Sequence, residues 1–145
     1  MKTLSLIIAL TLSAASATGC AKKNLAPESV PLDRVECARC RMLISTDSGG
    51  GQIVSATDDT RFYDDIGCLA ADWRGRSGDG RAFVRVAGGR WSDAMDASFA
   101  RPAAVATAMG SGIVAFALAA EARAADRDGR ALTFAEVVRA SGAPE

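Results

Sequence analysis

Three sulfur-bearing side chains lie close together near the start of the chain, in the hexapeptide Cys37-Ala38-Arg39-Cys40-Arg41-Met42. The chain contains no histidine, so a metal site at this position would have no imidazole ligand. Thiolates and thioethers are soft donors, which favour Cu(I) over ions that bind through nitrogen or oxygen. The residue types and their spacing therefore predict a Cu(I) site that uses Cys37, Cys40 and Met42.

The conformation expected around the cysteines supports a shared ion. An extended backbone from Cys40 onward would direct Cys40 and Met42 to the same side, because side chains two residues apart share a face. Cys37, in the preceding turn, can fold back towards the same point. A further soft ligand has to come from elsewhere in the chain. Met109 is the first candidate because it precedes a flexible glycine-containing stretch, and Met95 is the second.

The first residues predict a lipoprotein signal. Lys2 gives a short basic start, Leu4 to Leu12 is an apolar run too short for a stable span, and small residues at positions 17–19 precede Cys20. Cleavage would leave Cys20 as a lipid-bearing N-terminus; a secreted protein with an unused thiol is the alternative. We expect a signal peptide over residues 1–19, a lipidated flexible tether over 20–33, and attachment to the cell envelope facing the periplasm or exterior.

Other chemistry fits the cysteine pair less well. Thiol-disulfide oxidoreductases also have two cysteines separated by two residues, but their attacking cysteine begins a helix after a strand. Here only the tether precedes Cys37, so an envelope oxidoreductase is the second interpretation. A structural zinc site requires four cysteine or histidine ligands, and three cysteines remain if Cys20 is lipidated. A disulfide between Cys37 and Cys40, formed in an oxidising compartment, is the remaining alternative.

Two further groups of polar or sulfur-bearing residues have ordinary structural explanations. Cys68 lies in the first turn of a predicted helix, where the helix dipole could lower its pKa. Its apolar neighbours suit a small buried side chain equally well, so we prefer burial, with metal binding as a secondary role. Asp64 and Asp65 can bind a metal, but a helix cap accounts for at least one of them.

The elements that must position these residues follow a pattern that occurs twice. The first copy has strands at 42–45 and 52–57, a helix from Asp64 or Asp65 to Gly75, and a strand at 82–87. The second copy has strand-like segments at 91–99 and 112–116, a helix at 118–126, and a closing segment at 132–138. We therefore predict an α+β fold of two small repeated lobes of β-β-α-β order, over residues 34–89 and 90–145.

Composition and hydropathy exclude two classes of partner contact. The chain has 17 basic and 17 acidic residues, a balance that argues against nucleic acid or another polyanion. The stretch from Ala103 to Ala120 carries no charge and is long enough for a membrane span. Small and weakly polar residues dominate it, however, so we expect a buried loop and strand instead.

Three blocks of the sequence together resemble a known family. They are Cys-x-x-Cys-Arg-Met-Leu-Ile-Ser at 37–45, Phe-Tyr-Asp-Asp-Ile-Gly-Cys-Leu at 62–69, and Met-Gly-Ser-Gly-Ile-Val-Ala-Phe at 109–116. In this order they resemble the NosL family, lipoproteins of nitrous oxide reductase maturation. The similarity runs from about Glu36 to Val138.

The resemblance implies a non-enzymatic, periplasm-facing metallochaperone that delivers Cu(I) to a copper-dependent client enzyme. Nitrous oxide reductase is the client implied by the family, and other copper proteins are alternatives. Carried over by position, Cys40 and Met42 match the first motif of the family and Met109 matches the methionine of the second. Cys37 belongs to the first motif as well. The sequence leaves open whether a homodimer shares one ion.

Overall fold

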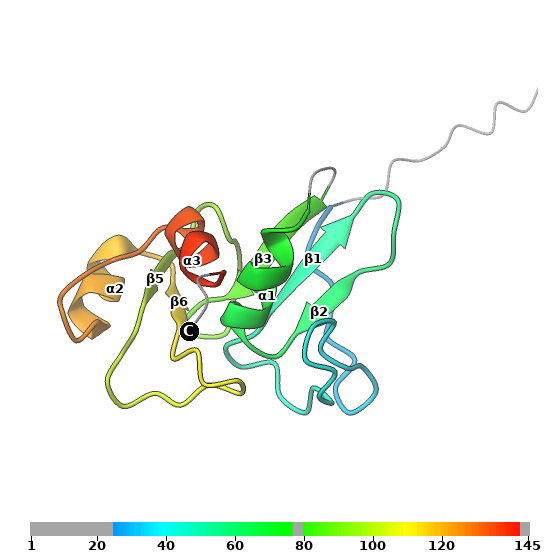
Figure 1. Ribbon diagram of the computed structural model, residues 1–145, viewed down its shortest axis with the longest axis horizontal. Helices are drawn as coiled ribbons and strands as arrows, with labels where there is room; N and C mark the ends of the chain where they lie inside the picture. Colours follow the sequence, from blue (N-terminus) through cyan, green and yellow to red (C-terminus); the bar gives the residue numbers. More distant parts are fainter. Residues whose placement is uncertain (1–24, 77–79, 143–145) are drawn as a thin grey trace, which may run out of the picture.

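Two antiparallel sheets, each accompanied by a helix, lie side by side in the computed structural model (Figure 1). The structure describes residues 25–76 and 80–142. The predicted signal peptide, the predicted lipid attachment at Cys20 and the start of the tether lie outside these residues. The mixture of sheets and helices confirms the predicted α+β class.

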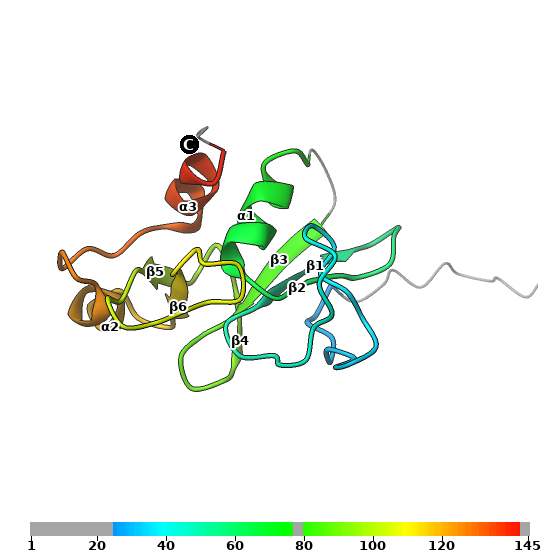
Figure 2. The same cartoon turned by 60° about the horizontal axis from the view of Figure 1, so that its bottom comes forward.

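The first sheet has four strands in the order β2-β1-β3-β4. The central strand β1 (Gly51–Ser55) pairs with β2 (Arg61–Tyr63) on one side and with β3 (Gly80–Arg85) on the other. β4 (Trp91–Asp93) extends the sheet by pairing with β3, although its residues were predicted to belong to the second lobe. The helix α1 (Ile66–Trp73) connects β2 to β3 and lies over one face of this sheet (Figure 2).

The second sheet repeats this strand order in a reduced form. β5 (Ser98–Ala100) pairs with β6 (Val114–Phe116), and α2 (Ala119–Ala125) follows. The chain then returns to β5 through an isolated bridge, in which Phe99 and Leu132 exchange two backbone hydrogen bonds of 2.8 and 2.7 Å. Each half of the chain thus runs strand, strand, helix, strand, and the last strand of the second half is shortened to one bridge.

The segment at 132–138 differs most from its prediction. It was expected to close the second lobe as a strand, but most of it forms the helix α3 (Phe134–Ala140). Thr133 and Glu136 make a capping box, in which the Thr133 N–H donates to the Glu136 carboxylate at 2.7 Å and the Glu136 N–H donates to the Thr133 hydroxyl at 3.3 Å. This reciprocal cap satisfies two otherwise unpaired helix N–H groups, which explains why the helix begins here.

Smaller differences occur in the extended segments. Residues 42–45 form no regular strand and contribute only one bridge, between Leu43 and Glu36. The predicted strand at 91–99 is divided, because the Met95 N–H donates to the Asp93 carboxylate at 2.9 Å and turns the chain between β4 and β5. The short strand β2 was not predicted.

The apolar stretch at 103–120 is also only partly as expected. Residues 103–106 and 108–110 are exposed, whereas Ile113, Ala115 and Phe116, in β6 or directly before it, are buried. The prediction of a buried loop was therefore wrong, and that of a buried strand was right. Within 25–76 and 80–142, no helix is long and apolar enough to cross a membrane.

A shared core joins the two lobes. The Phe134 ring of α3 lies between Trp73 of α1, at a centroid distance of 6.0 Å, and Phe99 of β5, at 5.8 Å. The backbone contributes as well, because the Ala87 N–H donates to the Ala115 carbonyl at 2.8 Å. The position of one lobe relative to the other is therefore fixed by packing and by hydrogen bonding.

Asp126, just after α2, holds together the far end of the second lobe. Its carboxylate accepts hydrogen bonds from the backbone N–H groups of Arg101 and Asp128, both at 2.9 Å, and of Arg130 at 3.2 Å. These bonds hold the pKa of the Asp126 carboxyl below its ordinary value. A carboxyl of this kind stabilises the fold above its unfolded pKa of about 3.9 and loses that contribution as the pH falls through the lowered folded value.

We therefore expect Asp126→Asn to lower the melting temperature at neutral pH, and the difference from the unsubstituted chain to vanish in acid. Thermal unfolding followed by circular dichroism at a series of pH values measures both effects. Asp128→Asn is the matched control, since this exposed carboxylate pairs with Arg130 at 2.9 Å on the surface and such pairs contribute little. A deficit that is the same at every pH would contradict a role for the Asp126 charge.

Candidate metal centre

Three thiols and one carboxylate meet beside the first turn of α1. The ligand atoms of Cys37, Cys40, Asp64 and Cys68 all lie within 4.8 Å of one another. Cys37 and Cys68 are buried, Cys40 and Asp64 are half-buried, and the three cysteines are free thiols. The structure thus brings together both cysteines of the predicted site and adds two donors, and we refer to these four residues as the cysteine cluster.

A tight turn positions the first two thiols. The Arg41 N–H donates to the Cys37 carbonyl at 3.0 Å, and the Cys37 N–H donates to the Met42 carbonyl at 2.8 Å. Arg41 adopts a left-handed φ of 68°, which lets the backbone reverse here. The Ala38 N–H donates to the Phe62 carbonyl at 2.8 Å, so the turn is attached to β2, the strand that leads to Asp64.

The end of β2 and the start of α1 supply the other two donors. Asp65 is the N-cap of α1, accepting a hydrogen bond from the Gly67 N–H at 2.6 Å, as the sequence predicted for one of the two aspartates. Its backbone is extended, with φ −142° and ψ 138°, and consecutive side chains of an extended segment point in opposite directions. Asp64 therefore faces the thiols, and Cys68 reaches the same point from the first turn of the helix.

Two thiols of the cluster, Cys40 and Cys68, have a raised pKa. Burial, with the neighbouring Cys37 thiol and Asp64 carboxylate adding to it, raises the pKa of the Cys40 thiol. Burial also raises the pKa of Cys68, and the other two thiols act in the same direction. The Cys40 sulfur lies 3.6 and 3.7 Å from the two oxygens of Asp64. A cation at this point would favour the thiolates, because opposite charge lowers a thiol pKa.

Met109 is attached to the same region through Asp65. The Met109 N–H donates to the Asp65 carboxylate at 3.0 Å, and the Thr107 hydroxyl donates to the same oxygen at 2.7 Å. Burial by itself would raise the pKa of Asp65, but the hydrogen bonds that it accepts, including one from Ser111, hold that pKa below its ordinary value. Met109 and Cys68 line one small cavity.

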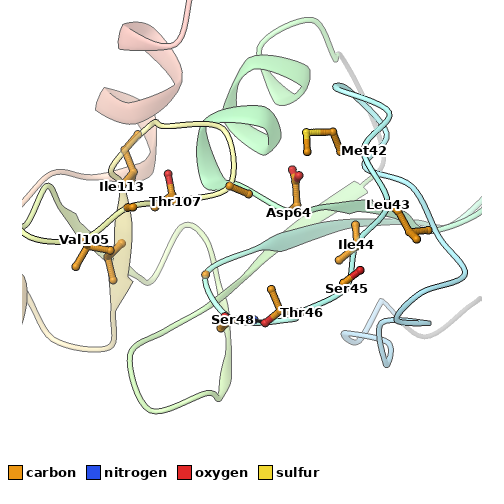
Figure 3. Close-up of a pocket in the computed structure, with 14 residues that line it drawn as sticks. Met42, Leu43, Ile44, Ser45, Thr46, Ser48, Asp64, Val105, Thr107 and Ile113 are labelled. Carbon is orange, nitrogen blue, oxygen red and sulfur yellow. Dashed lines mark hydrogen bonds between the residues drawn. The ribbon is translucent and has the colours of Figure 1, made fainter.

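Met42 lines an apolar groove between residues 42–49 and 105–108, and Asp64 lines the same groove. Figure 3 shows the Met42 and Asp64 side chains at the same end of this groove. The Met42 side chain is 52% exposed and that of Met109 is 46% exposed. Each predicted thioether thus shares a hollow with one member of the cysteine cluster, Met42 with Asp64 and Met109 with Cys68.

Met95 lies apart from these residues. It occupies the exposed turn between β4 and β5. Within the part of the chain that the structure describes, neither the groove with Met42 nor the cavity with Met109 includes it. Of the predicted ligands, Cys37 and Cys40 thus converge, Met42 and Met109 each line a hollow with one member of the cysteine cluster, and the reserve candidate lines neither hollow.

These features define a two-lobed α+β protein with a sulfur-rich cluster, a candidate site for a soft metal ion, where the first helix begins. The fold is similar to that in the crystal structure of the copper chaperone NosL from Shewanella denitrificans, with a TM-score of 0.64 and 20% sequence identity over 79% of this chain and 97% of that chain. This likeness confirms the NosL-like fold expected from the three sequence blocks. No protein-family model matches the chain, and no curated protein matches it.

Proposed function

We propose that this protein is a metallochaperone that binds Cu(I) as cargo in the cysteine cluster and transfers it to a copper-dependent enzyme. The observation that carries the proposal is the convergence of three thiols and a carboxylate within 4.8 Å. Three sulfur donors and no imidazole form a ligand set suited to Cu(I). The similarity of the fold to that of a copper chaperone supports the same conclusion.

Both loading and release follow from the chemistry of these donors. A thiol binds a metal only after it loses its proton, so Cu(I) must displace protons from Cys37, Cys40 and Cys68. Met42 and Met109 need no deprotonation, and each is about half exposed. Sulfur donors of a client can therefore approach from the thioether side and take the ion by ligand exchange.

The proposed setting comes from the sequence. Lipid attachment at Cys20 would hold the protein at the cell envelope, facing the periplasm or exterior, where the client enzyme receives copper. The NosL resemblance makes nitrous oxide reductase the first client to test. Sharing of one ion by two chains, which the sequence left open, is not part of the proposal. The role is that of a carrier, and no step of it requires catalysis.

The geometry favours metal binding over disulfide exchange. An attacking thiol in an oxidoreductase is partly exposed and has a lowered pKa. Here Cys37 is fully buried, and the pKa of Cys40 is raised, chiefly by burial. Zinc becomes a stronger competitor than the sequence suggested, because Asp64 supplies the fourth donor that a closed tetrahedral site requires.

Anaerobic titration of the reduced protein with Cu(I), against a chromophoric Cu(I) chelator, tests the proposal. We expect one Cu(I) per chain to be retained, and an excess of Zn²⁺ to leave it in place. A chain that gives up all of its Cu(I) to the chelator would disprove the proposal. Displacement of Cu(I) by Zn²⁺ would instead assign the cluster to zinc.

The same titration measures the contribution of the thioethers. We expect Met42→Leu and Met109→Leu each to weaken Cu(I) retention about tenfold or more, the effect typical of groups that support a metal site. Leucine keeps the volume and the apolar character of methionine but offers no sulfur. Met95→Leu is the matched control and should retain Cu(I) as the unsubstituted chain does. Equal Cu(I) affinities in all three variants would show that neither the Met42 nor the Met109 thioether contributes to the site.

A further inference from the structure

We infer that Asp65 is a positioning residue of the metal centre, whose buried carboxylate fixes the loop at 107–111 so that the Met109 thioether lies beside the cysteine cluster. The inference rests on the proposed copper binding and adds to it the residue that joins the two lobes at the site. The sequence predicted Asp65 as a helix cap or a metal ligand, and neither role includes fixing this loop.

The two oxygens of the carboxylate make different contacts. Oδ1 accepts the Gly67 N–H at 2.6 Å and caps α1, the helix that carries Cys68. Oδ2 accepts the Met109 N–H at 3.0 Å and the Thr107 hydroxyl at 2.7 Å. One side chain therefore connects the helix that bears a thiol of the cluster with the loop that bears the thioether.

The loop lies directly against the start of α1. A Cβ atom added to Gly67 would lie 2.8 Å from the Ser111 Cβ and 3.0 Å from Asp65 Oδ1, so only glycine fits between the helix and the loop. Within the loop, the Thr107 hydroxyl accepts the Gly112 N–H at 3.0 Å. The bonds from Asp65 are thus made to a folded loop that is already close to the helix.

Burial makes this connection hard to break. The Asp65 side chain is fully buried, and a buried carboxylate that loses its hydrogen-bond donors is strongly destabilising. Movement of the loop away from the helix would remove the Met109 N–H and the Thr107 hydroxyl from Oδ2. The loop should therefore hold its place before copper arrives, so that less ordering is required when the ion binds.

A helix cap alone does not account for these contacts. Capping requires one acceptor oxygen, and asparagine or serine provides it as well as aspartate does. The cap explains Oδ1 and leaves both loop contacts of Oδ2 unexplained. Substitution of Asp65 by asparagine separates the two roles, since the amide can keep a capping oxygen towards Gly67 but presents an NH₂ group, which cannot accept a hydrogen bond, towards the loop.

The test is a double-mutant cycle between Asp65→Asn and Met109→Leu, read out as retention of Cu(I) by the reduced full-length protein against a chelator. If Asp65 acts through Met109, each single substitution should weaken retention about tenfold or more, and the second substitution should add little to the first. The number of sulfur neighbours of copper, measured by X-ray absorption, should fall equally in both single variants. Asp126→Asn, a carboxylate-to-amide change in the other lobe, should destabilise the fold without changing Cu(I) retention.

Several outcomes would overturn the inference and leave the proposed function intact. The first is unchanged Cu(I) retention in Asp65→Asn, and the second is normal Cu(I) retention in Met109→Leu. The third is a double variant whose loss of Cu(I) affinity equals the sum of the two single losses. If Asp65→Asn does not fold, Thr107→Val takes its place in the cycle, because it removes one of the two loop donors and keeps the carboxylate. A smaller loss that disappears in the Met109→Leu background is then expected. Failure of the unsubstituted chain to retain Cu(I) would instead overturn the proposed function.

Discussion

Cys40→Ser is expected to lower the affinity for Cu(I) by more than about a hundredfold. Loss of a residue that merely supports a metal ligand already costs ten- to a hundredfold, and Cys40 is a ligand in the proposed site. Its sulfur lies next to both oxygens of Asp64, in the same tight turn as Cys37. A serine hydroxyl is a hard donor that stays protonated, so the substitution removes the ligand with little change in volume.

Chelator competition under anaerobic conditions measures this effect, and thermal unfolding of the metal-free variant verifies that the fold is kept. Cys68→Ser should also weaken binding, because its sulfur belongs to the same cluster, whereas Met95→Leu should not. Retention of Cu(I) by Cys40→Ser with the affinity of the unsubstituted chain would reject the cysteine cluster as the binding site. Loss in Cys40→Ser but not in Cys68→Ser would restrict the site to the turn and the thioethers.

Local signals in the sequence predicted the elements whose caps and turns lie within the same segment. The aspartate pair Asp64 and Asp65, placed just before an apolar helical stripe, predicted the start of α1, and the structure assigns the cap to Asp65. The strand predicted at 82–87 corresponds to β3, although the repeated order located the two sheets only in part, since 42–45 forms no strand and β2 was not predicted. In both cases the residues that decide the structure lie next to the element that they define, so the pattern can be interpreted without tertiary contacts.

The same reasoning fails where a local polar signal lies inside an apolar pattern and contradicts it. The pattern at 132–138 was compatible with a strand, but the capping box of Thr133 and Glu136 starts a helix there, and the burial of Phe134 against the first lobe retains it. The division of the segment at 91–99 depends on a turn at Asp93. Such signals compete with apolar patterns of similar length, and only the assembled core selects between them.

The metal centre shows the same limit. The spacing of Cys37, Cys40 and Met42 predicted a shared sulfur site, because these residues are close in the sequence. Asp64 was one of two adjacent aspartates, at least one of which a helix cap explained without a metal. Cys68 was expected to be buried. Both expectations agree with the structure, since Asp65 is the cap and Cys68 is buried. Their position beside the other thiols depends on the turn at Arg41 and on its attachment to β2, which no local pattern reveals.

Phe134→Ala is expected to lower the free energy of unfolding by about 3 to 5 kcal/mol, the usual cost of removing a buried phenylalanine ring. The ring is 2% exposed and contacts Trp73 of the first lobe and Phe99 of the second. Because domains of this size are stable by only about 5 to 15 kcal/mol, the loss would be a large part of the total. Equilibrium unfolding in urea measures it through the shift of the midpoint.

Leu118→Ala is the matched control, since the Leu118 side chain is 60% exposed and its truncation should change stability by less than about 0.5 kcal/mol. A similarly small loss in Phe134→Ala would contradict the role of α3 in joining the lobes.

The Phe134→Ala variant also separates the two parts of the proposed site. The cysteine cluster belongs wholly to the first lobe, whereas Met109 belongs to the second, so weaker joining of the lobes should reduce the Met109 contribution to Cu(I) retention before it reduces that of the thiols.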